Sequence, residues 1–198
     1  MNYLAHAYLS FGNSDILVGN MISDFVKGKK KYDYPLSVQK GIMLHRMIDT
    51  FTDVHPATKA AIAVFKPIVG TYAGAFVDVV YDHFIANDEK EFSDEGSLAA
   101  FAGRTYDELT RHEACLPERF QKMLPYMINQ NWLLNYRTYS GIESSFGGLF
   151  RRAKYLEYTM HVFTRFKEEY RYLNDCYNNF FPDVKAMALS EYNMLNKL

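Results

Sequence analysis

Residues 35–53 form the stretch of this 198-residue chain that best predicts its fold. They read Pro35-Leu-Ser-Val-Gln-Lys-Gly-Ile-Met-Leu-His-Arg-Met-Ile-Asp-Thr-Phe-Thr-Asp53. Apolar residues such as Ile42, Met43, Met47 and Ile48 recur at short helical spacings, with charged residues between them. This amphipathic pattern is typical of a helix that turns one face toward a core. We therefore expect a helix from about Pro35 to Asp53.

The same periodicity continues on both sides of this stretch, and neither β-type alternation nor a βαβ rhythm is present. Pro56 suits the first turn of a further helix, which we expect to break or kink near Pro67. The remaining helices are expected at 76–86, 97–113, 118–137, 139–152, 153–180 and 183–197, with Pro182 ending the long one. Because no Pro/Gly/Ser-rich linker divides the chain, the sequence predicts a single all-α domain over residues 1–198, with seven to nine helices.

Composition excludes several classes of protein. Hydrophobic residues make up 48% of the chain, and 22 basic against 23 acidic residues give a net charge of −1. That balance favours a globular protein and gives no reason to expect nucleic-acid binding. Cys115 and Cys176 match no metal or redox spacing, which suggests free thiols in the cytoplasm. Lys66, Pro67 and two glycines interrupt the most apolar window, residues 60–77, so no membrane span or membrane partner is expected.

The first 83 residues contain polar side chains that a plain helical core does not need. His45 and Asp49 are spaced i,i+4 and would lie on one helix face, as would Asp78 and Asp82. Burying an unpaired carboxylate costs roughly several kcal/mol, and a divalent cation bound beside it offsets that cost. The candidate ligands are His6, Asp24, His45, Asp49, Asp82 and His83. Such a mixed set suits Mn²⁺, Fe²⁺, Mg²⁺ or Zn²⁺ and supports phosphoester hydrolysis.

Each of these residues also has an ordinary structural explanation. His6 could be a core histidine, Asp24 could pair with the lysines that follow it, and His45 with Asp49 could be a surface pair. The basic run Lys27, Lys29, Lys30 and Lys31 has two interpretations as well. It is either a solvated loop or a docking patch for an acidic partner.

In this order, the motifs resemble those of the acyl carrier protein phosphodiesterase family. The matching pieces are Asn2-x-Leu-Ala-His6, Gly19-Asn20-x-x-x-Asp24-Phe-Val-x-Gly28, Gly41-Ile-x-x-His45-Arg46-x-Ile-Asp49-x-x-Thr52-Asp53-x-x-Pro56, Asp78-Val-x-x-Asp82-His83-Phe, Trp132-Leu-x-x-Tyr136 and Phe181-Pro182. They cover essentially the whole chain. Within them, Asp82-His83 has the reverse order of the adjacent pair that gives HD-domain phosphohydrolases their name.

The resemblance implies an HD-domain-like helical fold and a divalent metal, with Mn²⁺ favoured and Mg²⁺ or Fe²⁺ possible. The implied reaction hydrolyses the phosphodiester between 4′-phosphopantetheine and a serine of holo-acyl carrier protein, an acidic partner. All six candidate ligands are then expected at the site. Catalytic roles are expected for Asp24, His45, Asp49 and Asp82, while Asp78 and Arg46 would support the ligands or contact the phosphate.

Two rival functions stay open at this point. One is a metal phosphohydrolase that acts on a small nucleotide. The other is a non-catalytic helical binding module in which the polar residues form buried pairs. The sequence predicts no particular oligomeric state.

Overall fold

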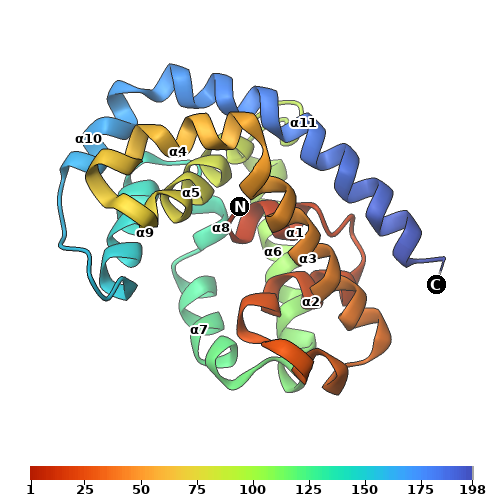
Figure 1. Ribbon diagram of the computed structural model, residues 1–198. Coiled ribbons are helices and arrows are strands. Elements are labelled where there is room, and N and C mark those ends of the chain that lie inside the picture. Colours follow the sequence, from red (N-terminus) through yellow and green to blue (C-terminus); the bar gives the residue numbers. More distant parts are fainter. Residues whose placement is uncertain (198) are drawn as a thin grey trace.

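The computed structural model describes residues 1–197, and within them the chain is all-α, as predicted (Figure 1). The helices are α1 (Tyr3–Tyr8), α2 (Ser14–Ile22), α3 (Leu36–Val54), α4 (Pro56–Val69), α5 (Ala73–Ala86), α6 (Glu95–Arg111), α7 (Glu118–Asn129), α8 (Trp132–Asn135), α9 (Tyr139–Arg152), α10 (His161–Glu168) and α11 (Tyr170–Leu195). Short 3₁₀ turns are η1 (Ser23–Phe25), η2 (Gly28–Asp33), η3 (Gly70–Tyr72) and η4 (Glu113–Cys115). Two of the eleven α-helices in the described part, α1 and α8, are shorter than eight residues, so nine longer ones remain.

Helix α5 lies at the centre of the molecule. Eleven of its 14 residues are buried, and it packs against α1, α4, α9 and α11. Figure 1 shows α11 running along the outside of α3 and α4. This arrangement brings the N-terminal helix α1 into the interior, where its four residues from Leu4 to Ala7 are all buried.

Helices α2 and α3 cross at two glycines. A methyl group on Gly19 would come within 2.1 Å of the Val38 carbonyl oxygen, and one on Gly41 within 2.4 Å of the Ile16 carbonyl oxygen. Both contacts are shorter than any real side chain makes, and both are to backbone, which cannot move aside cheaply. The two helices therefore touch backbone to backbone, which fixes the distance between the residues that follow each glycine.

Three of the expected helix boundaries are wrong. The expected helix at 118–137 breaks after α7, where Asn131 adopts a left-handed φ of 44°. Residues 153–160 are not helical, and none of them is fully buried, although Leu156 packs against the core. Pro182 does not end a helix but lies inside α11. It is tolerated because Pro182 and Asn178, the residue whose carbonyl loses its partner, both lie on the exposed face.

The stretch Pro56–Ala86 is long and apolar enough to resemble a membrane span by length and composition. It is not one continuous helix, because Gly70 has a φ of 55° and the η3 turn separates α4 from α5. The two halves pack against each other and contribute buried residues such as Phe65 and Phe76 to the core. Both cysteines are free thiols, as predicted, with Cys115 exposed and Cys176 buried.

Asp82 holds the start of α1 in place. Its carboxylate is completely buried and accepts hydrogen bonds from the backbone N–H groups of Asn2, Leu4 and Ala5 at 3.1, 2.7 and 3.2 Å. These N–H groups belong to the first turn of a helix, which has no internal partners for them and favours negative charge. One turn earlier on α5, Asp78 accepts a hydrogen bond from the Met1 amine at 2.9 Å. Both carboxylates thus fix α1 against α5.

We predict that Gly41→Ala destabilises the protein by about 2–3 kcal/mol, because the added methyl group forces α2 and α3 apart. Gly103→Ala is the matched control, since Gly103 lies in α6 with nothing within 4 Å of an added methyl group. That control should be neutral or stabilising by up to about 1 kcal/mol. Urea unfolding of both variants measures the difference. Equal stability of the two would show that the close crossing is not required.

A second prediction concerns Asp82. Asp82→Asn should destabilise the protein by about 1–3 kcal/mol, because the new amide group would point a donor at backbone N–H donors. Asp107→Asn, at an exposed position of α6, is the control and should change stability by less than about 0.5 kcal/mol. Thermal melts of both variants provide the measurement. An unchanged melting temperature for Asp82→Asn would contradict this anchoring role.

Candidate metal centre

Four of the predicted ligands come together between α1, α2 and α3. His6 comes from α1, Asp24 from the η1 turn after α2, and His45 and Asp49 from consecutive turns of α3. The two imidazole rings stack with their centroids 3.9 Å apart. The close crossing of α2 and α3 carries His45 inward, because His45 lies one turn after Gly41.

Both carboxylates reach the Nε2 atoms of the histidines. Asp49 bridges the pair, with Oδ1 at 3.2 Å from His6 Nε2 and Oδ2 at 3.0 Å from His45 Nε2. Asp24 Oδ1 lies 3.4 Å from the same His45 nitrogen. The side chains of His6 and His45 are only 4% and 7% exposed, whereas those of Asp49 and Asp24 are 41% and 75% exposed. The centre is therefore buried on the histidine side and open on the carboxylate side.

Asn20 orients both histidines. Its side-chain oxygen accepts a hydrogen bond from His6 Nδ1 at 2.8 Å, and its backbone oxygen accepts one from His45 Nδ1 at 2.7 Å. The amide nitrogen of Asn20 is held in turn by the His6 carbonyl and the Ser10 hydroxyl. With both Nδ1 atoms donating, the Nε2 atoms are the ones that face the carboxylates. A hydrogen bond to the second ring nitrogen is the usual way in which a metal-binding histidine is oriented.

The charges of the cluster are strongly coupled. Burial, followed by the neighbouring His45, lowers the pKa of His6 to about 4. Burial also opposes the charge on His45, but Asp24 and Asp49 outweigh it and raise the pKa of His45 to about 9. The close imidazoles of His45 and His6 hold the pKa of Asp49 well below its usual range despite its burial. One positive charge is therefore favoured between the carboxylates.

These residues fit a divalent cation. The ligand atoms of His6, His45 and Asp49 all lie within 4.8 Å of one another. The Nε2 atoms of both histidines are buried, and neither makes a hydrogen bond of good geometry to the nearby carboxylates. Ligand atoms on one ion with bonds of about 2.1 Å are about 3.0–3.4 Å apart, close to the distances from Asp49 to the two histidines. Asp24, which is more exposed, lies beside this set at 3.4 Å from His45 Nε2.

The structure does not bring Asp82 and His83 into this centre. Asp82 is occupied by the backbone of α1, and burial raises its pKa to about 7, against the opposing effect of the nearby Met1 amine and those N–H groups. His83 donates from Nδ1 to the Tyr136 carbonyl at 2.7 Å and accepts from the Tyr170 hydroxyl at 3.1 Å. The i,i+4 spacing of Asp78 and Asp82 and the adjacency of Asp82 and His83 do not predict these hydrogen-bond partners.

The two residues expected to support the ligands or contact phosphate have other contacts. Asp78 binds the Met1 amine, as described above. The Arg46 guanidinium donates to the Val26 carbonyl at 2.9 Å, immediately after the η1 turn. Arg46 thus fixes the segment that carries Asp24.

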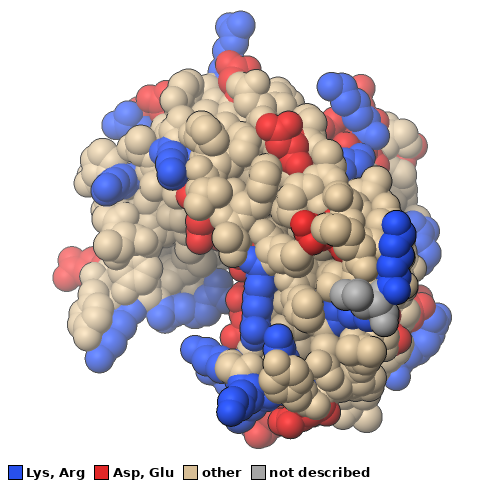
Figure 2. Space-filling view, turned by 45° about the vertical axis from the view of Figure 1, so that its right-hand side comes forward, with Lys and Arg blue, Asp and Glu red and all other residues tan. Residues whose placement is uncertain are grey.

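A cleft of about 440 Å³ opens beside Asp24. It is lined by Asp24, Phe25, Lys27, Lys30 and Arg119, while Lys29 and Lys31 do not line it. Figure 2 shows Lys and Arg side chains around a hollow on one face of the molecule. Two of the four lysines of the basic run, together with an arginine from α7, therefore border the exposed carboxylate of the centre.

Comparison with known proteins agrees with the motifs. A model of the acyl carrier protein phosphodiesterase family matches residues 1–184. A curated relative of that name from Serratia proteamaculans is 31% identical over 95% of this chain and 97% of its own length. Others of that name, from Photorhabdus laumondii and Yersinia pestis, are 30% and 29% identical over 95% of this chain and cover 95% and 97% of their own lengths.

No solved structure gives a significant match to this chain, so the HD-domain-like character of the fold stays a prediction. The family model and the three relatives nevertheless agree with one another and extend over nearly the whole sequence. The enzyme class expected from the sequence, a phosphoric diester hydrolase, is the one that the family's name describes. The chain belongs to the acyl carrier protein phosphodiesterase family.

Proposed function

We propose that this protein hydrolyses the phosphodiester between 4′-phosphopantetheine and a serine of holo-acyl carrier protein, giving apo-carrier and free 4′-phosphopantetheine. The observation that carries the proposal is the donor set of His6, His45 and Asp49, oriented by Asn20 and found in a chain of this family. A protein that only binds a partner would not need two buried imidazoles with their Nε2 atoms unpaired.

The division of labour follows from burial. His6, His45 and Asp49 would hold a divalent cation, with Mn²⁺ preferred and Mg²⁺ or Fe²⁺ as alternatives. That cation supplies positive charge for the phosphate oxygens and acidity for the attacking water. Asp24 is exposed at the mouth, and the His45 imidazole, 3.4 Å away, is the main cause that lowers its pKa. Its ionised carboxylate would accept a hydrogen bond from the water and take up the proton that the water loses.

The basic cleft beside Asp24 supports an acidic protein substrate. Lys27, Lys30 and Arg119 place three positive charges next to the centre in a chain whose net charge is −1. Positive charge gathered at one mouth would attract and orient an acidic carrier. Because such a carrier is met in the cytoplasm, we propose that the enzyme acts there.

The direct test is mass spectrometry of holo-acyl carrier protein after incubation with the enzyme. With Mn²⁺, the carrier should lose the phosphopantetheinyl group, and excess chelator should prevent the loss until Mn²⁺ is restored. A parallel panel of nucleotides tests the rival substrate class. Hydrolysis of a nucleotide while the holo-carrier stays intact would contradict the proposed substrate. Full activity in excess chelator would show that the reaction does not require a metal ion.

We predict that Asp49→Asn lowers kcat on holo-carrier by at least about a hundredfold, because the bridging carboxylate between the two histidines is lost. Metal content of the purified variant should fall as well. The matched control is Asp53→Asn, one turn later on α3 and exposed, which should retain both activity and metal. Retained metal and activity in Asp49→Asn would exclude this carboxylate from the site.

A further prediction concerns docking. The double substitution of Lys27 and Lys30 by Glu should raise KM for holo-carrier about tenfold or more, with little change in kcat, and should weaken its salt dependence. The control replaces Lys59 and Lys66, exposed residues of α4, by Glu and changes the net charge equally. Equal kinetics of the two double variants across a salt series would show that the lysine run is a solvated loop with no role in docking.

A further inference from the structure

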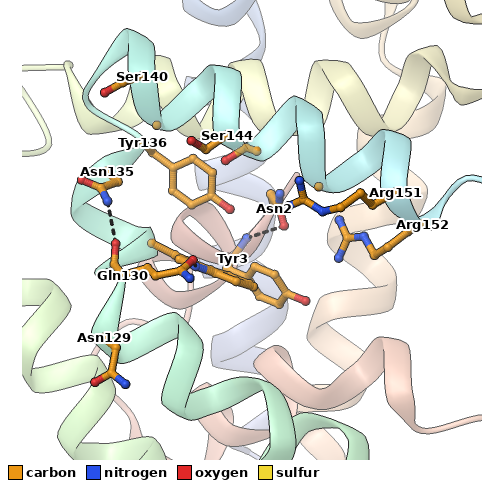
Figure 3. Close-up of a pocket in the computed structure, with 14 residues that line it drawn as sticks. Asn2, Tyr3, Asn129, Gln130, Asn135, Tyr136, Ser140, Ser144, Arg151 and Arg152 are labelled. Atoms are coloured by element: carbon orange, nitrogen blue, oxygen red, sulfur yellow. Dashed lines mark hydrogen bonds between the residues drawn. The ribbon is translucent and has the colours of Figure 1, made fainter. Parts of the chain in front are cut away.

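A second and larger cleft lies at the C-terminal end of α7, whereas the basic cleft lies at its N-terminal end. It has a volume of about 670 Å³, and Figure 3 shows it between α9 and the turn that joins α7 to α8, with the start of α1 as its floor. Its lining residues come from three separate parts of the sequence. They are Asn2, Tyr3, Asn129, Gln130, Trp132, Asn135, Tyr136, Ser140, Gly141, Ser144, Ser145, Gly148, Arg151 and Arg152.

The chemistry of the cleft changes along its length. In Figure 3, Arg151 and Arg152 lie at one end with Tyr3, whereas Asn135 and Gln130 lie at the other. The walls between them carry amide and hydroxyl groups with the aromatic rings of Trp132 and Tyr136. A pair of guanidinium groups suits a phosphate, and a wall of amides and hydroxyls suits a chain that itself contains amides.

The arginine end of the cleft is the end nearer the metal centre. Tyr3 and His6 are spaced i,i+3 on α1 and so lie on neighbouring positions of one side of that helix. Burial raises the pKa of the Tyr3 hydroxyl to about 12, while Arg152 and Asp24 act on it in opposite directions. Tyr3 therefore lies within reach of both charges, one from the cleft and one from the metal centre. Its hydroxyl stays protonated and able to donate a hydrogen bond.

Helix α7 borders both clefts. Arg119 in its first turn lines the basic cleft beside Asp24, Met123 contacts the Tyr3 hydroxyl, and Asn129 at its end lines the larger cleft. A ligand that extends along α7 from one cleft to the other would therefore begin beside Asp24 and pass Tyr3.

We propose that the larger cleft binds the 4′-phosphopantetheine arm of the carrier. The phosphate lies at the end formed by Arg152, Arg151 and Tyr3, and the amide-containing chain extends toward Asn135 and Gln130. This assignment rests on the proposed function. It identifies the surface of the enzyme that recognises the arm, as distinct from the surface that recognises the carrier. The carrier body would remain over Lys27, Lys30 and Arg119.

The volume of the cleft agrees with this occupant. Sites for small molecules usually enclose about 300–1,000 Å³, whereas the folded carrier is far too large to enter. The arm contains one phosphate, amide groups and a hydroxyl, and the lining offers guanidinium, amide and hydroxyl groups that can bind each of these kinds. Arm and carrier would thus be recognised by two separate surfaces that meet at the scissile bond.

Trp132 allows a test that does not depend on turnover, because it is the only tryptophan of the chain and it lines the cleft. Free 4′-phosphopantetheine should change the Trp132 fluorescence in a saturable way, and pantetheine without phosphate should bind about tenfold or more weakly. Nucleotides of equal charge should bind more weakly than 4′-phosphopantetheine. Equal binding of nucleotides would show that the cleft recognises phosphate alone and would overturn the assignment of the arm.

Two variants locate the ligand within the cleft. Arg152→Gln should weaken binding of 4′-phosphopantetheine about tenfold or more and leave binding of pantetheine unchanged. Ser144→Phe, at an exposed position of α9 that faces the cleft in Figure 3, should weaken binding of both by filling the space. Ser190→Phe, at an exposed position of α11, is the matched control and should bind as the unsubstituted protein does. Thermal melts check that each variant is folded.

The outcomes for the cleft and for the proposed function are separable. If the enzyme hydrolyses holo-carrier but 4′-phosphopantetheine does not change the Trp132 fluorescence, the cleft assignment is overturned and the proposed reaction stands. The same holds if folded Ser144→Phe still binds 4′-phosphopantetheine fully. A saturable Trp132 response that Ser144→Phe removes would support the cleft even if the carrier were not hydrolysed, and in that case the reaction alone would fail.

Discussion

The contact between α2 and α3 is the constraint on which the centre depends. Because Gly19 and Gly41 have no side chains, the two helices meet backbone to backbone. Asn20 follows the first glycine directly, and its backbone carbonyl can therefore reach His45, one turn after the second, at 2.7 Å. The Asn20 side chain reaches back to His6 on α1. A wider crossing would separate Asn20 from His45 and leave each imidazole free to rotate.

Electrostatics then explain why this cluster is built at one edge of the core. Two carboxylates close to two imidazoles carry an excess of negative charge, so the protein needs either a proton on His45 or a cation between the side chains. Full burial would make such a site costly whenever it is empty. The exposure of Asp24 and Asp49 lets water share their charge, while the buried histidines keep the geometry fixed. A cation could therefore enter and leave without unfolding the helices.

Periodicity predicted the helical fold, and the i,i+4 spacing placed His45 and Asp49 on one helix face. His6 and Asp24 were candidates only as polar residues among apolar ones. It could not separate His45 and Asp49 from Asp78 and Asp82, since both pairs have the same spacing in an apolar context. Only the tertiary structure shows that Asp82 serves the free N–H groups of α1. Asn20 had two available signals, its place in the family motif and its polar side chain inside an apolar helix, but its role depends on a neighbouring helix. Pro182 was misleading because water can satisfy the carbonyl that a proline on an exposed helix face leaves without a donor.

Its resemblance to a metal motif suggested that the adjacent pair Asp82-His83 binds a metal ion. In the structure both side chains instead hold neighbouring segments in place. Asp82 binds the start of α1, which carries Tyr3 and His6, and His83 binds the carbonyl of Tyr136 in the wall of the larger cleft. Neighbouring residues of one buried helix therefore fix two surfaces that come from opposite halves of the sequence. Because α5 has no exposed residue and packs against α1, α4, α9 and α11, it holds these two surfaces relative to each other. A reaction that needs an extended arm and a metal ion to meet at one phosphorus atom requires such a fixed arrangement. A substitution at Asp82 or His83 would thus act on the chemistry through the position of α1 or Tyr136, without either side chain touching the substrate.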